Sequence, residues 1–165
     1  MADARERGDI DVIELAAVGV ADLDGDGRLD LVLSNNNAPP TIYRNCWARS
    51  GNWLQLSLEG SVSNRDAIGA AAKVTIADPA TGATRTLTRV VEAGSGFASQ
   101  RMFPLHFGLG ESDVVEIRLV WPSGTVQEFP EQDILNLGVP NRALHIREGD
   151  ELRTRSPSGS PSAAL

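Results

Sequence analysis

The chain has 165 residues, with 22 acidic and 15 basic side chains and a formal net charge of −7. This length is typical of about one domain, and the acidic excess argues against a nucleic-acid or anionic-membrane binder. No apolar run approaches the ~20 residues that a membrane-spanning helix needs. Residues 1–30 hold nine acidic and only three basic side chains, so the negative charge indicates a local feature near the N-terminus.

The two ends of the chain differ from its middle. Residues 1–11 carry many charges of both signs, and residues 151–165 are rich in serine, so we expect a flexible N-terminus and a disordered tail. No signal peptide is predicted, because the first residues lack an apolar stretch, and export would require a longer precursor. Cys46 is the only cysteine, so no intrachain disulfide can form.

Between these ends, short runs of Val, Ile, Leu and Thr alternate with clusters of Gly, Pro, Asn and Asp, a pattern typical of strands and turns. Only residues 131–135 resemble a helical turn. Turns recur about every ten residues, which favours an all-β, antiparallel sandwich or barrel-like module. The predicted strands span residues 13–20, 29–34, 41–44, 53–58, 72–77, 85–92, 105–108, 114–121, 125–129 and 143–147.

One of these runs predicts which side chains enter the core. In residues 115–121, the apolar side chains of Val115, Ile117, Leu119 and Trp121 alternate with Glu116 and other residues. Successive side chains of a strand point to opposite faces. We therefore expect these four side chains to lie together on the buried face.

The sharpest motif is the acidic loop Asp-Leu-Asp-Gly-Asp-Gly-Arg-Leu-Asp at residues 22–30, with carboxylates at loop positions 1, 3, 5 and 9. Calcium prefers about six to eight hard oxygen ligands, which this spacing can wrap around one ion. We predict a Ca²⁺ site with carboxylate ligands from Asp22, Asp24, Asp26 and Asp30 and the main-chain carbonyl of Arg28.

The acidic loop is not an EF-hand, because Leu33 stands at loop position 12 in place of Glu and strand-like runs flank the loop. We expect it to join two strands and to clamp them, with no chemical role. A solvated acidic turn and a magnesium site are the alternatives. Carboxylates this close repel one another, which disfavours an unliganded turn, and magnesium suits fewer protein ligands.

Several further motifs follow in a fixed order. They are Asn-Trp-Leu-Gln-Leu at 52–56, Ser-Asn-Arg-Asp-Ala-Ile-Gly-Ala at 63–70, Ala-Gly-Ser-Gly-Phe-Ala-Ser-Gln at 93–100, Leu-His-Phe-Gly-Leu-Gly at 105–110 and Trp-Pro-Ser-Gly at 121–124. Residues 18–32 resemble an FG-GAP/VCBS repeat, the calcium-loop repeat of integrin-type β-propellers. The later motifs resemble the ASPIC and UnbV domain, found after such repeats in bacterial proteins and in the cartilage acidic protein family.

This resemblance implies a single propeller-blade-like repeat over residues 12–45, which carries the calcium loop, and a β domain over residues 46–150. It also implies calcium binding, adhesion and an extracellular or periplasmic location, and no catalytic residues carry over from it. The family has several repeats, whereas this chain has one, so open strand edges are expected. The repeat must then fold onto the second module, pair with another chain as in a homo-oligomer, or belong to a truncated propeller protein.

Polar and aromatic residues outside the loop are further candidates for ligand binding. Asn64, Arg65 and Asp66 lie in a predicted turn, where they either bind a ligand or fix the loop through an Arg–Asp pair. Trp47 lies in a polar turn and is the aromatic residue that we most expect to be exposed for stacking on a sugar. Trp121 is expected in the core.

A hydrolase would need a Ser/His pair or two carboxylates about 5–10 Å apart. Ser95 and His106, with Asp66 or Glu92 as the acid, are the candidates for a triad. Glu92 and Glu116 are candidate carboxylates, while a hydrogen-bonded structural role is the simpler expectation for His106.

The leading interpretation is a calcium-binding extracellular β module that binds a glycan or protein surface, with no catalysis assumed. One alternative is a hydrolase that acts on a polysaccharide or an ester. The other is an architectural end module of a propeller protein.

Overall fold

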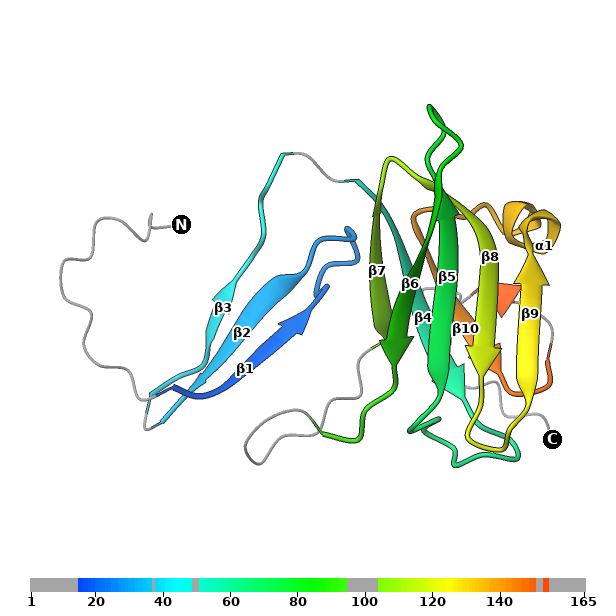
Figure 1. Cartoon of the computed structure of the whole chain (residues 1–165). Coiled ribbons are helices and arrows are strands. Elements are labelled where there is room, and N and C mark those ends of the chain that lie inside the picture. Colours follow the sequence, from blue (N-terminus) through cyan, green and yellow to red (C-terminus); the bar gives the residue numbers. More distant parts are fainter. Residues whose placement is uncertain (1–14, 37, 49–50, 95–103, 151–152, 155–165) are drawn as a thin grey trace, which may run out of the picture.

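The computed structural model describes residues 15–36, 38–48, 51–94, 104–150 and 153–154. These residues form eleven strands and one short helix, arranged in three sheets (Figure 1). The predicted all-β class is confirmed, and each of the ten predicted runs forms a strand. Residues 1–11 and Ser95 lie outside the described residues.

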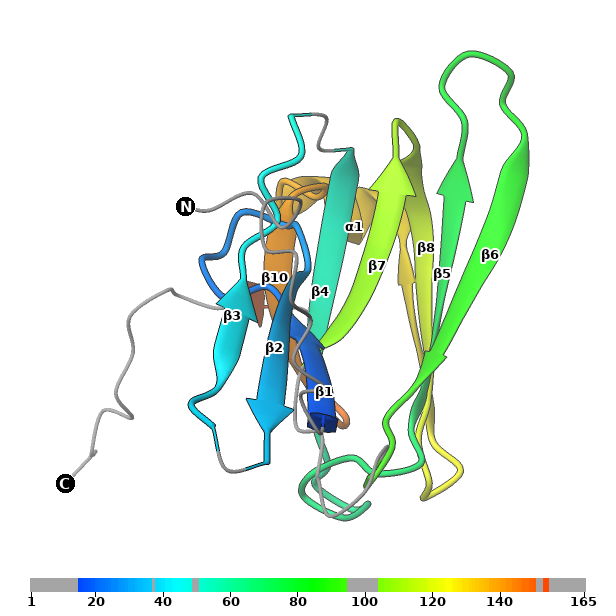
Figure 2. The same ribbon diagram turned by 90° about the vertical axis from the view of Figure 1, so that its left-hand side faces the viewer.

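A small antiparallel sheet at the N-terminus contains β1 (Leu15–Ala21), β2 (Asp30–Asn35) and β3 (Thr41–Tyr43), in that order. Ala21 pairs with Asp30, so the acidic loop is the connection of a β-hairpin. We call these three strands the N-terminal sheet. It stands beside the rest of the molecule, with its loop end directed toward β4 and β7 (Figures 1 and 2).

The second sheet has the order β6-β5-β8-β9 and is antiparallel throughout. Its strands are β5 (Ala71–Ala77), β6 (Thr84–Val90), β8 (Asp113–Val120) and β9 (Val126–Pro130). The predicted helical turn is present as α1 (Glu131–Asn136), directly after β9. Within the described parts of the chain, no helix has the length and apolar character that crossing a membrane requires.

The third sheet has the order β11-β10-β4-β7 and is mixed. Its strands are β4 (Asn52–Glu59), β7 (Leu105–Gly110), β10 (Arg142–Arg147) and β11 (Arg153–Thr154). β4 pairs with β10 in parallel, which the predicted antiparallel pattern did not include. The short strand β11 falls within the segment 151–165 that was expected to be a disordered tail, and it pairs with β10.

The two larger sheets pack face to face around one core, which makes a sandwich and leaves no closed barrel. Leu54, Leu56 and Phe107 enter the core from one sheet, and Ile117 and Trp121 from the opposite side. Trp121 is 2% exposed, as expected for a core residue. We call these two sheets, with their described connections and α1, the sandwich.

The expected inward position of Val115 is wrong. Val114 is buried in its place, while Val115 is only partly buried. Thr75 pairs with Glu116, but the adjacent Ile76 pairs with Val114, so β8 contains one extra residue at Val115. Such a bulge reverses the alternation of side chains on one side of it.

Candidate metal centre

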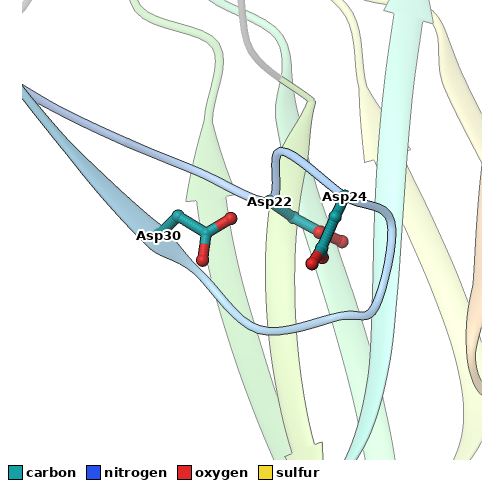
Figure 3. Close-up of side chains that lie close together, drawn as sticks. All are labelled: Asp22, Asp24 and Asp30. Carbon is teal, nitrogen blue, oxygen red and sulfur yellow. The ribbon is translucent and has the colours of Figure 1, made fainter. Parts of the chain in front are cut away.

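The hairpin between β1 and β2 brings three carboxylates together. Asp22 directly follows β1 and Asp30 begins β2, so the pairing of these strands closes the ends of the loop. Asp22, Asp24 and Asp30 each offer one carboxylate oxygen, and these three atoms lie within 4.8 Å of one another (Figure 3). Hard oxygen donors in this arrangement fit a calcium ion.

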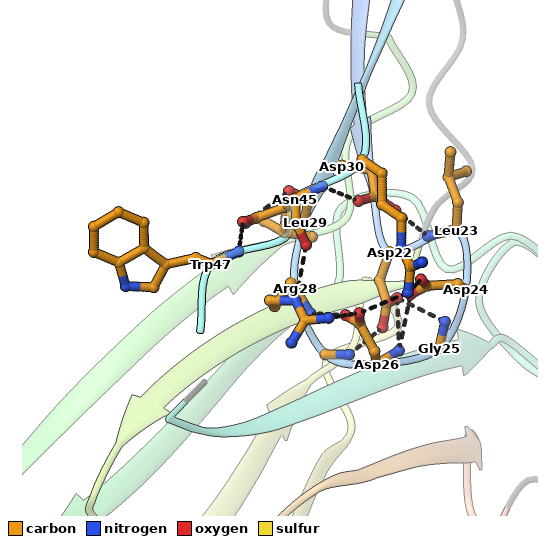
Figure 4. A network of polar contacts seen from close by, with 12 residues as sticks. Asp22, Leu23, Asp24, Gly25, Asp26, Arg28, Leu29, Asp30, Asn45 and Trp47 are labelled. Carbon is orange, nitrogen blue, oxygen red and sulfur yellow. Dashed lines mark hydrogen bonds and ion pairs between the residues drawn. The ribbon is translucent and has the colours of Figure 1, made fainter. Parts of the chain in front are cut away.

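Asp22 organises the backbone of the loop. Its Oδ1 atom accepts hydrogen bonds from the backbone N–H groups of Gly25 at 2.8 Å and Asp26 at 3.1 Å (Figure 4). Its Oδ2 atom accepts one from Gly27 at 2.9 Å. Gly25 and Gly27 have φ angles of 77° and 85°, which residues with a side chain rarely adopt. The glycines therefore let the loop curl around the carboxylate.

Asp30 is 3% exposed and is held by two backbone donors. The N–H of Asn45 donates to Oδ1 at 2.8 Å, and that of Leu23 donates to Oδ2 at 3.1 Å. These hydrogen bonds, first that of Asn45 and then that of Leu23, lower the pKa of Asp30, although its burial acts in the opposite direction. Asp30 is thus ionised at neutral pH, as a metal ligand must be.

Two arginines neutralise part of the charge of the loop. Asp26 forms an ion pair with Arg28, and Arg44 pairs with Asp24 and lies 3.8 Å from Asp26. Asp26 is not one of the three close carboxylates, and ligation by Asp26 and by the Arg28 carbonyl stays a prediction. Arg44, which follows β3, was missed because it lies outside the acidic motif. It reduces the carboxylate repulsion on which the sequence interpretation depended.

The loop contacts the sandwich through β4. The amide Nε2 of Gln55 donates to Asp22 Oδ2 at 3.0 Å. The indole ring of Trp53 lies against Gly27, where a Cβ atom would overlap the ring. Neither residue was predicted to contact the loop, although both belong to the motif at residues 52–56. The N-terminal sheet thus folds onto the second module, one of the three possibilities that its open edges allowed.

A groove of about 1500 Å³ lies beside this contact, lined by both the loop and the sandwich. The predicted residues Arg65, Asp66, Glu92 and His106 all line it. Burial lowers the pKa of His106, and the charge of Arg89 acts in the same direction, whereas the charge of Asp22 opposes it. The groove thus gathers several candidates that are far apart in the sequence.

The comparisons with known proteins match both parts of the chain. A sequence model of the ASPIC and UnbV family matches residues 60–153, and one of the FG-GAP repeat matches residues 15–45. The chain belongs to the ASPIC and UnbV family. The predicted resemblance is confirmed. We call residues 60–153 together with the preceding strand β4 the ASPIC and UnbV module.

The curated relatives are longer proteins of one name. Cartilage acidic protein 1 of Homo sapiens is 33% identical over 147 residues, which cover 84% of this chain and 20% of the relative. Its counterpart in Mus musculus is 34% identical over 111 residues, covering 64% and 16%, and that of Xenopus tropicalis is 30% identical over 133 residues, covering 74% and 19%. The chain therefore spans about a fifth of the length of these relatives.

Other predicted site residues lie apart from the candidate metal centre. Glu116 accepts a hydrogen bond from the Thr75 hydroxyl at 3.3 Å on the β6-β5-β8-β9 sheet, and it does not line the groove. Asn64 exchanges two hydrogen bonds with the backbone of Ile68, a structural role. Trp47 is 71% exposed, as expected, and its role as a sugar platform stays a prediction.

Glu148 is a buried carboxylate of the ASPIC and UnbV module that the sequence analysis missed. Its Oε2 atom accepts hydrogen bonds from the N–H groups of Ser61, Val62 and Ser63 at 2.7–3.0 Å, and Oε1 accepts from the Ser63 and Ser123 hydroxyls. Burial raises its pKa, but these donors, led by Ser123, outweigh that effect and lower the pKa of Glu148 to about 2. Glu148 therefore ties the end of β10 to the loop after β4.

Proposed function

We propose that the chain is a calcium-binding β module of an extracellular protein and that it binds a glycan or protein surface. The group of Asp22, Asp24 and Asp30 oxygens within 4.8 Å carries this proposal. The match of residues 15–45 to the FG-GAP repeat supports it, because the resemblance implies calcium ligands in this loop. The extracellular location rests on the likeness to Cartilage acidic protein 1, whose name associates it with cartilage.

In this proposal calcium has a structural role. The ion would join the end of β1 to the start of β2 through Asp22 and Asp30, with Asp24 closing the loop between them. The N-terminal sheet needs such support, because Ala21 is the only buried apolar side chain among its described residues. An ion that binds the folded loop but not the unfolded chain stabilises the fold by mass action.

The proposed binding surface is the groove beside the loop. Its lining includes the cations Arg65 and Arg89, the anions Asp66 and Glu92, and the neutral Gln55. The groove therefore offers both hydrogen-bond donors and acceptors, which suits the hydroxyl groups of a glycan or a protein surface that carries charges of both signs. The exposed ring of Trp47 supplies a separate stacking surface for a sugar.

A thermal melt in calcium and in chelator tests the metal site. At calcium a hundredfold above its Kd, stabilisation of about 2.7 kcal/mol is expected, and each kcal/mol raises the Tm of a chain this size by about 2–4 °C. Asp30→Asn should abolish the rise. Asp78→Asn is the matched control, since Asp78 also accepts two backbone hydrogen bonds, from Ala80 and Thr81, but lies in the turn after β5. A wild-type Tm that is the same in calcium and in chelator would contradict the proposal.

A second candidate is an architectural end module of a longer propeller protein. The N-terminal sheet exposes large apolar side chains on both faces, since Ile42 is 62% exposed on one face and Val18, Leu31 and Tyr43 are exposed on the other. Apolar side chains on both faces are typical of a sheet that is covered on both sides. Sedimentation of the purified chain tests it, because an unpaired sheet of this kind should drive self-association at high concentration.

A further inference from the structure

The carboxylate of Asp22 accepts hydrogen bonds both from the acidic loop and from the ASPIC and UnbV module. Asp22 Oδ2 accepts the Gln55 amide at 3.0 Å and the Gly27 backbone N–H at 2.9 Å. The same Gln55 nitrogen lies 3.5 Å from His106 Nδ1 on the adjacent strand β7. The residue at the first position of the loop is therefore held by a side chain of the sandwich that lies 33 positions later in the chain.

Trp53 forms the surface on which the loop rests. Its ring stacks on His106, with 6.4 Å between ring centroids and 13° between planes. A Cβ atom at Gly27 would overlap the indole, whereas a Cβ atom at Gly25 would meet nothing within 4 Å. Both glycines have positive φ angles, which disfavour a side chain. Gly27 must in addition lack a side chain because the sandwich packs against it.

Residues that hydrogen-bond to a metal ligand orient that ligand and change its affinity. We propose that Gln55 is a positioning residue for Asp22 and that Trp53 seats Gly27, so that the calcium loop is also the joint between the N-terminal sheet and the sandwich. Calcium binding and docking then strengthen each other, and the coupling is the same in both directions. This inference rests on the proposed calcium site.

Calorimetric titration of the full chain with calcium tests the role of Gln55. Gln55→Leu removes the donor but retains a side chain of similar size, and the Kd for calcium should rise roughly tenfold. Gln132→Leu on α1 is the control, because Gln132 contacts Asn136 within the helix and not the loop. The Tm in chelator should change far less than the Kd, which separates positioning of the ligand from general stability.

A comparison of two glycines tests the docking surface. Gly25→Ala and Gly27→Ala carry a similar backbone cost, because their φ angles are 77° and 85°. Only Gly27→Ala should lift the loop from Trp53, so it should weaken calcium binding more and speed hydrogen exchange of residues 23–29 in chelator. Adding Trp53→Ala to Gly27→Ala should restore part of the affinity, because the overlap is then removed.

The outcomes separate this inference from the calcium site itself. If the wild-type chain binds calcium but Gln55→Leu and Gly27→Ala behave like their controls, the joint is refuted while the calcium site stands. If the wild-type chain does not bind calcium, the calcium site and the coupling are both refuted, even where Gly27→Ala still speeds exchange in chelator. Weaker binding in both variants, with recovery in the double variant, supports the joint.

Discussion

Different interactions stabilise the N-terminal sheet and the sandwich. The sandwich has a continuous apolar core, in which Leu54, Leu56, Phe107 and Trp121 are almost fully buried. The N-terminal sheet buries little apolar surface, and its fixed points are the polar contacts of the loop around Asp22. Hydrophobic burial keeps its strength without an ion, whereas a loop of carboxylates depends on what neutralises it. Calcium should therefore affect the N-terminal sheet more than the sandwich.

The largest expected effect comes from the core of the sandwich. Leu56→Ala should lower the free energy of unfolding by about 2–5 kcal/mol, because it removes buried methyl groups and leaves a cavity. Denaturant unfolding followed by circular dichroism measures this loss. Val62→Ala is the control, since Val62 is exposed, and it should change the free energy by less than about 0.5 kcal/mol. Equal losses in the two variants would refute the assignment of stability to this core.

Glu148→Gln comes next, because it breaks the polar contact that links two loops of the sandwich. An amide has one acceptor oxygen, so either the three backbone N–H groups that share Oε2 or the two hydroxyls of Ser63 and Ser123 that donate to Oε1 lose their acceptor. The Tm at pH 7 should fall by several degrees. Glu128→Gln, which breaks only the exposed pair with Arg118, should leave the Tm nearly unchanged.

The same residue predicts the acid sensitivity of the sandwich. The pKa of Glu148 falls from an ordinary 4.5 to about 2 on folding, so the unfolded chain binds more protons between these values. Its stabilising contribution is complete above pH 4.5 and is lost as the pH falls toward 2. Melts from pH 6 to pH 2.5 should therefore show a shallower decline for Glu148→Gln. Parallel declines in both proteins would contradict this account.

A smaller effect of opposite sign is expected at the loop. Arg44→Ala removes a cation beside Asp24 and Asp26, which should strengthen calcium binding by about two- to fivefold, the range of an exposed ion pair. Without calcium the same variant should destabilise the loop, because the carboxylates then repel one another. Calorimetric titration against Arg85→Ala, a variant of an exposed residue on β6, provides the measurement. Weaker binding in Arg44→Ala would show that Arg44 supports the ligands.

The smallest effect is expected on the outer face of the N-terminal sheet. Ile42 is 62% exposed, so Ile42→Ser should change the free energy of unfolding by less than about 0.5 kcal/mol. Its effect should be on association, because it removes an apolar side chain from an open sheet. Sedimentation would show whether this variant self-associates less than the wild-type chain.

Features that depend on neighbours in the sequence were predicted well. Alternation identified the strands, and the spacing within the loop indicated that Asp22, Asp24 and Asp30 lie close together, because these residues lie within nine positions. Their ligation of calcium stays a prediction. Contacts between distant segments were missed. The parallel pairing of β4 with β10, the donation of Gln55 to Asp22 and the donors around Glu148 all depend on the tertiary arrangement. The bulge at Val115 also escaped notice, because only the pairing with β5 reveals the extra residue.

Hydrogen exchange of the full chain, with saturating calcium and with chelator, tests most directly whether the ion acts mainly on the N-terminal sheet. Calcium should slow exchange in the loop and in β1 and β2 more than in the central strands β5 and β8 of the sandwich. Unchanged exchange in the loop on adding calcium, or equal slowing in β5 and β8, would contradict the account.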